Sequence, residues 1–163
     1  NPFFVVALTP FSMAFFGFLE KKGKEVSAPA RIAWGMLIAA VGFGVITMAS
    51  TNLISPKDLG DSTQSILSPS WLISTYFTLT IAELLLSPMG ISFVSKVAPP
   101  KYKGMMMGGW FVATAIGNYL SSIPSMLWNK IPLMYNWAIL IALCLISAFV
   151  MFALLKKLNK MTA

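Results

Sequence analysis

The sequence predicts an all-α, polytopic membrane protein: a single bundle of five transmembrane helices within residues 1–163. Of its residues, 57% are hydrophobic and only 10% are charged, whereas an average soluble domain has about 25% charged residues. The mean hydropathy is +0.77. Five apolar stretches are each about long enough to cross a hydrocarbon core of roughly 30 Å. They cover residues 3–19, 32–54, 71–97, 105–123 and 133–155.

The first two stretches contain residues that shape helices. Pro10 lies in the first, where it removes a backbone hydrogen bond and favours a kink. The second holds Gly35, Gly42 and Gly44, and small residues on an apolar helix favour close packing against another helix. The connection that follows, residues 52–70, is rich in Ser, Pro, Gly and Asp, so we expect a loop without chemistry.

The third and fourth stretches each show a line of residues at helical spacing, and many of these residues are polar. Such spacing places residues on one helical face. In the third stretch, which Pro88 is expected to kink, the line is Tyr76, Thr80, Glu83, Ser87 and Ile91. In the fourth it is Met107, Trp110, Thr114, Gly117 or Asn118, and Ser121. We expect antiparallel neighbours that form one wall of a solvated cavity, although ordinary packing through hydrogen-bonded Thr and Asn explains the second line equally well.

The fifth stretch contains the only cysteine of the chain, Cys144, which we expect to be a small packing residue. The chain has no histidine. A tetrahedral metal site built from Cys and His and a Ser/His/Asp triad are therefore both excluded. No cofactor is expected.

Aromatic residues gather near the ends of the stretches. Amphipathic aromatics anchor at the headgroup level of a membrane, and we expect this of Trp71, Tyr102, Trp128, Tyr135 and Trp137. Trp110 lies several residues inside the fourth stretch. We therefore expect it to face the interior of the bundle.

The cations gather on alternate connections. Ten of the twelve Lys and Arg residues flank the first or third connection or follow the last stretch: Lys21, Lys22, Lys24, Arg31, Lys96, Lys101, Lys103, Lys156, Lys157 and Lys160. Cytoplasmic connections carry such an excess, so we expect the C-terminus in the cytoplasm and the N-terminus outside. The net charge of +7 does not indicate nucleic acid binding, because that requires cations clustered with exposed aromatics on a soluble face.

Glu83 is the only acid inside an apolar stretch. A carboxylate at membrane depth costs several kcal/mol unless it is paired or hydrated. Its expected role is therefore to bind a cationic ligand group, to carry a proton, or both. The plainer alternative is a buried acid that ties two helices together.

The run AELLLSPMGIS at residues 82–92, followed by KVAP at 96–99 and MMGGWF at 106–111, resembles the proton-dependent oligopeptide transporters of the major facilitator superfamily. Asn1-Pro2 is similar to the Asn-Pro that begins their eighth helix. The resemblance covers essentially the whole chain, as helices eight to twelve. It implies the C-terminal part of a proton-coupled symporter for di- and tripeptides that works by alternating access, with no catalytic residues and with a proton as coupling ion.

The resemblance also implies site residues. Glu83 and Asn1 hold the amine of the peptide, Ser87 lies nearby, and Trp110 lines a side-chain pocket. The cytoplasmic gate is formed by Ile91, Met107 and Phe111. The implied partners are di- and tripeptides, protons, membrane lipid and the N-terminal half of the transporter, in the membrane of a bacterial cell. That half, with its Glu-x-x-Glu-Arg motif, is absent here, and the chain start at Asn1, with no initiator Met and no signal peptide, indicates an interior fragment.

Other functions remain open on sequence alone. One is a major facilitator for another small nitrogenous solute. Another is a non-transporting membrane subunit in which Glu83 pairs with a cation of a different chain. A membrane-embedded enzyme is poorly supported, because one intramembrane carboxylate without a histidine leaves no acid–base pair.

Overall fold

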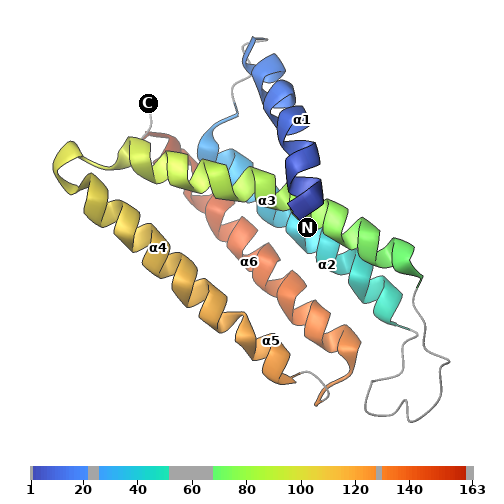
Figure 1. The fold of residues 1–163 in the computed structure, drawn as a ribbon. Coiled ribbons are helices and arrows are strands. Elements are labelled where there is room, and N and C mark those ends of the chain that lie inside the picture. The colour runs from blue at the N-terminus through green and yellow to red at the C-terminus, as the bar shows by residue number, and fades with distance from the viewer. Residues whose placement is uncertain (1, 22–25, 52–67, 128–129, 161–163) are drawn as a thin grey trace.

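The computed structural model describes residues 2–21, 26–51, 68–127 and 130–160. Within these ranges the chain is helical, without strands (Figure 1). The elements are α1 (Pro2–Lys21), α2 (Ala28–Ser50), α3 (Pro69–Val97), the 3₁₀ turn η1 (Pro100–Tyr102), α4 (Lys103–Leu120), α5 (Ser122–Leu127) and α6 (Leu133–Lys160).

Three of the five predicted membrane spans are long apolar helices, and the other two are shorter or divided. In the described part of the chain, α2, α3 and α6 are long and apolar enough to cross a membrane. The apolar part of α1, Phe3–Phe18, is shorter. The fourth predicted span is divided into α4 and α5. All five predicted stretches are nevertheless helical over most of their length.

The start of α2 and the course of the fourth helix differ from the sequence prediction for local reasons. α2 begins at Ala28, four residues before the predicted 32–54, because Pro29 occupies the first turn, where its fixed φ suits a helix start. The fourth helix breaks at Ser121. Pro124 lacks the N–H that would bond to the carbonyl of Leu120 and its ring crowds that carbonyl.

Local interactions stabilise the break after α4 and the end of the last helix. The Ser121 hydroxyl donates to the carbonyl of Asn118 at 2.6 Å, and the Ser122 hydroxyl to that of Tyr119 at 2.7 Å. α6 continues to Lys160, five residues beyond the prediction. Lys157 and Lys160 lie in its last turn, where cations interact favourably with the helix dipole.

α2 is the central helix, packed along both α3 and α6 (Figure 1). Gly35 and Gly42 make the contact with α3 close, as the sequence predicts. A methyl group added to Gly35 would lie 3.0 Å from Cγ of Leu86 and 3.1 Å from the carbonyl oxygen of Ala82. Gly44 has no such neighbour within 4 Å, so its expected role in packing is not met.

Aromatic rings join α2 to α6, and α1 leans on α3. Phe43 stacks on Trp137 with ring centroids 6.4 Å apart, and Trp34 meets Phe152 edge to face at 6.0 Å. Trp137 therefore packs inside the bundle as well as lying near a helix end. Phe4 and Phe77 make the corresponding contact between α1 and α3. The expected anchors Trp71, Tyr102 and Tyr135 are exposed near helix ends, and Trp128 lies outside the described residues.

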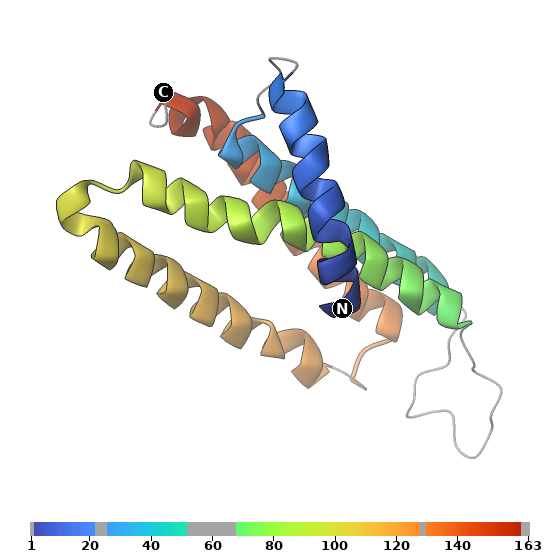
Figure 2. The ribbon, with the colours of Figure 1, turned by 45° about the horizontal axis from the view of Figure 1, so that its top comes forward.

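One end of the molecule collects the cations. The α3–α4 turn, the start of α2, the end of α1 and the end of α6 lie at the same end in both views (Figures 1 and 2). The described cations there are Lys21, Arg31, Lys96, Lys101, Lys103, Lys156, Lys157 and Lys160. We call this the basic end. The α5–α6 connection, with Lys130, lies at the opposite end.

We predict that Gly35→Ala destabilises the full-length protein by about 1–3 kcal/mol, the usual cost of overpacking, because the Ala82 carbonyl cannot move aside without disturbing α3. Gly44→Ala is the matched control. It should be neutral or stabilising by up to about 1 kcal/mol, since Ala is the better helix former. Unfolding in detergent measures both variants, and equal effects would show that the α2–α3 contact is looser than described.

Candidate functional site

Glu83 occupies the middle of α3. It stands fourteen positions after Pro69 and fourteen before Val97, the two ends of the helix. At 1.5 Å per residue the carboxylate stands about 21 Å from either end. Because α3 is long and apolar enough to cross a membrane, this position corresponds to mid-depth in the hydrocarbon core.

The packing of α3 on α2 turns Glu83 away from that interface. Leu79, Ala82 and Leu86 are among the α3 residues that contact the glycines of α2, and Ala82 is only 2% exposed. The next residue along a helix is rotated by about 100°. Glu83 is accordingly exposed on the flank of α3, on a face that Ser87 and Gly90 share at helical spacing.

Thr80 does not lie open on the predicted polar line. It is fully buried, and its hydroxyl donates to the carbonyl of Tyr76 at 2.7 Å. Such bonding to the preceding turn satisfies a buried hydroxyl without a ligand. The line on α3 is therefore exposed at Tyr76, Glu83 and Ser87 and interrupted at Thr80, so the prediction of a continuous wet stripe was wrong at this position.

Trp110 is seated on Gly90. Its ring fills the space into which a side chain at Gly90 would project, against Cη2 and Cζ2 of the indole, and Trp110 is half-buried as a result. Gly90 stands seven residues after Glu83, two helical turns on the same face. The contact places the indole on the Glu83 face of α3, toward the basic end.

Gly90 belongs to the motif at residues 82–92, but the sequence alone predicts no role for it. Its spacing of seven residues from Glu83 indicates only that both residues share a helical face. The contact with Trp110 is what gives Gly90 a role. Gly90 and Trp110 lie twenty positions apart in the chain, on different helices. Helical periodicity within one helix therefore cannot predict their contact.

The three residues expected at the gate all lie near the α3–α4 turn. Ile91 adjoins Gly90 in α3 and is 41% exposed. Met107 is half-buried one turn before Trp110 on α4. Phe111, the neighbour of Trp110, is 59% exposed. The fold thus gathers them in one region at the basic end, although no described side chain covers Phe111.

α4 touches α3 only near this turn and then diverges from it (Figures 1 and 2). Along α4 every residue is exposed except Met107 and Trp110. Thr114 donates its hydroxyl to the carbonyl of Trp110 at 2.9 Å and makes no cross-helix hydrogen bond. Helices α3 and α4 are therefore antiparallel, as predicted. They diverge from their shared turn, however, and do not pack along their length into the single wall that the sequence predicts.

The remaining predictions concern Asn1 and metals. Asn1 lies outside the described residues, so its place beside Glu83 stays a prediction. Among the residues that the structure describes, no group of three or more His, Cys, Asp or Glu side chains could hold a metal ion. Cys144 is half-buried within α6.

The fold of the chain matches one part of a larger solved structure. The chain superimposes on a crystal structure of a mutant peptide transporter POT in complex with alafosfalin with a TM-score of 0.82 and 23% identity, covering 99% of this chain and 31% of that chain. Residues 1–155 match the family model PTR2, described as the POT family. This chain belongs to the POT family, as the motif resemblance predicts.

Curated relatives carry the same family signal. The chain is 32% identical over 123 residues to the peptide transporter YePEPT of Yersinia enterocolitica, covering 76% of this chain and 23% of the relative. It is 29% identical over 127 residues to dipeptide and tripeptide permease A of Escherichia coli, covering 76% and 23%. The chain thus spans about a quarter of the length of these relatives, which are transporters and not enzymes.

We predict that Gly90→Ala and Trp110→Ala are strongly coupled in a double-mutant cycle on the full-length protein. With Trp110 present, Gly90→Ala should destabilise by about 1–3 kcal/mol, since the indole must leave its seat. With Trp110→Ala in place, Gly90→Ala should become neutral or stabilising by up to about 1 kcal/mol. Unfolding of the four proteins in detergent gives the coupling. Additive effects would place the indole elsewhere.

Proposed function

We propose that this chain is the C-terminal part of a proton-coupled symporter for di- and tripeptides that works by alternating access. The single observation that carries the proposal is the position of Glu83, at mid-length of α3 and exposed on its flank. Membership of the POT family and the printed names of the relatives support the substrate class.

The chemistry of Glu83 fits a peptide amine. An intramembrane carboxylate needs a cationic partner or a proton, and the ammonium of a di- or tripeptide is such a partner. A charge-assisted hydrogen bond of this kind contributes about 1.5–3 kcal/mol. Ser87, four residues further along the same face, can add a hydroxyl contact, and Asn1 is proposed to approach the same amine.

The same carboxylate provides a reason for coupling. If a proton and an ammonium bind one group, the affinity for each depends on the other by thermodynamic linkage. Transport then requires two states of the protein that expose the site to opposite sides. The α3–α4 pair, joined mainly at its turn, is proposed to move between these states.

The other site residues extend from Glu83 toward the basic end. We assign the indole of Trp110 to a pocket for a peptide side chain, because it lies on the Glu83 face of α3 and is only half-buried. The constriction beyond it on the cytoplasmic side is assigned to Ile91, Met107 and Phe111. The N-terminal half of the longer protein would supply the opposite wall, over the exposed surface of α4.

The proposed location is the bacterial cell membrane, with the basic end in the cytoplasm. Cytoplasmic segments carry the excess of Lys and Arg, and the fold brings eight of the described cations to that one end. The N-terminus of the chain then lies outside and the C-terminus inside.

We predict that Glu83→Gln in the full-length transporter weakens peptides with a free amine by about ten- to a hundred-fold, because it keeps the shape of the side chain and removes its charge. Peptides with an acetylated amine should lose far less. Competition binding in detergent, without a proton gradient, measures recognition apart from coupling.

The N-acetylated peptide is the internal control for folding, since a damaged site would lose both ligands. Equal losses for the blocked and free peptides would show that Glu83 serves protons or packing, and the assignment to the amine would fail.

We predict that a cysteine at position 61 reacts with an impermeant maleimide added outside the cell, whereas one at position 103 reacts only after the cytoplasmic side is opened. Each cysteine is introduced into a full-length background in which Cys144 is replaced by Ala, so that only one thiol of this segment reports. The reverse pattern would overturn the proposed orientation.

A further inference from the structure

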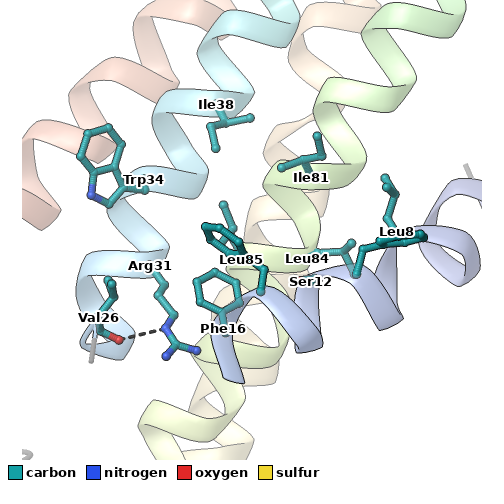
Figure 3. A pocket seen from close by; sticks show the side chains of 12 residues that line it. Leu8, Ser12, Phe16, Val26, Arg31, Trp34, Ile38, Ile81, Leu84 and Leu85 are labelled. Carbon is teal, nitrogen blue, oxygen red and sulfur yellow. Dashed lines mark hydrogen bonds between the residues drawn. The ribbon is translucent and has the colours of Figure 1, made fainter. Parts of the chain in front are cut away.

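A cavity lies on the other side of α3 from Glu83. It has a volume of about 450 Å³ and lies between α1, α2 and α3 (Figure 3). Ten of its twelve lining residues are apolar, and the two polar ones are Ser12 and Arg31. α3 contributes Ile81, Leu84 and Leu85 but not Glu83, so the cavity is separate from the proposed peptide site. We call it the α1–α3 groove.

The α1–α3 groove is elongated and open to the outside of the molecule. Along α1 its lining recurs on one face from Leu8 to Phe16, a rise of about 12 Å. Phe11 and Phe15 line it and are still 73% and 59% exposed, so the groove opens between the helices. A slot of this length and composition suits a flexible hydrocarbon chain.

Arg31 stands at one end of the groove, in the first turn of α2 (Figure 3). Its Nε donates to the carbonyl of Val26 at 2.9 Å, its Nη1 contacts the sulfur of Met89 at 3.7 Å, and its Cζ lies 4.2 Å from the centroid of the Phe16 ring. These contacts hold the guanidinium in one place. Arg31 is only 9% exposed and still lines the groove, and the planar fork of a guanidinium matches the geometry of a phosphate.

The surroundings of Arg31 are suited to a lipid headgroup. Lys21, in the last turn of α1, and Arg31, in the first turn of α2, are the described cations of these two helices, and both lie at the basic end. Trp34, one turn further along α2, lines the groove and is 55% exposed, as is usual for an aromatic at the membrane interface. Basic pockets between transmembrane helices favour anionic lipid headgroups.

We propose that the α1–α3 groove binds an anionic phospholipid from the leaflet at the basic end, with one acyl chain between α1 and α3 and the phosphate at Arg31. Arg31 at the end of the groove would meet the phosphate of such a lipid, and the apolar lining would meet its acyl chain. A wholly apolar occupant, such as another helix, would make no use of the cation at the mouth. The proposal does not depend on peptide transport.

The test uses the full-length transporter, stripped of lipid in detergent and titrated with phosphatidylglycerol or phosphatidylethanolamine while native mass spectrometry counts bound lipid. Ser12→Trp fills the groove and should lower phosphatidylglycerol binding by at least about fivefold. The matched control is Met13→Trp, because Met13 is the next residue of α1, is exposed and does not line the groove. It should leave binding unchanged.

Arg31→Gln should lower phosphatidylglycerol affinity by at least about fivefold, the effect of roughly 1 kcal/mol per cation, and leave phosphatidylethanolamine binding unchanged. Where this variant fails to fold, quenching of Trp34 fluorescence by phosphatidylglycerol with brominated chains replaces it, with Trp34→Phe as the blank. Equal binding of both lipids, equal effects of Ser12→Trp and Met13→Trp, or no Trp34 quenching would each overturn the proposal.

Discussion

The arrangement of this bundle depends on one carboxylate at the middle of a helix that is long and apolar enough to cross a membrane. Glu83 has no acidic or basic neighbour within its own helix closer than Lys96. A charge at mid-depth is tolerated only on a face that meets protein, water or a ligand. The face that Glu83 occupies therefore cannot face lipid, which fixes how α3 is turned.

The packing of α2 enforces this orientation. Gly35 and Gly42 let Leu79, Ala82 and Leu86 approach α2 closely, and the same rotation of α3 presents Glu83, Ser87 and Gly90 on the neighbouring flank. Trp110 of α4 packs against Gly90, and this contact brings α4 next to the Glu83 face of α3. The opposite flank of α3 lines the apolar α1–α3 groove, so one helix separates Glu83 from that groove.

The length of the apolar runs predicted the five helical stretches. Spacing within one helix predicted the position of Glu83 on the line with Ser87 and the glycine contact of α2. It failed where tertiary contacts or single residues decide. Thr80 shares the spacing but is buried, Pro124 breaks the fourth helix, and Gly44 faces no neighbour. The seat of Trp110 on Gly90 and the groove at Arg31 each join separate helices, which no pattern along one helix can reveal.

The most direct test is a structure of the full-length protein with a bound dipeptide such as dialanine. The account predicts the peptide ammonium about 2.7–2.9 Å from a carboxylate oxygen of Glu83, the length of a charge-assisted hydrogen bond, and a peptide side chain against the indole of Trp110. A peptide bound elsewhere, with its amine beyond direct contact and Glu83 bonded only to protein, would contradict it.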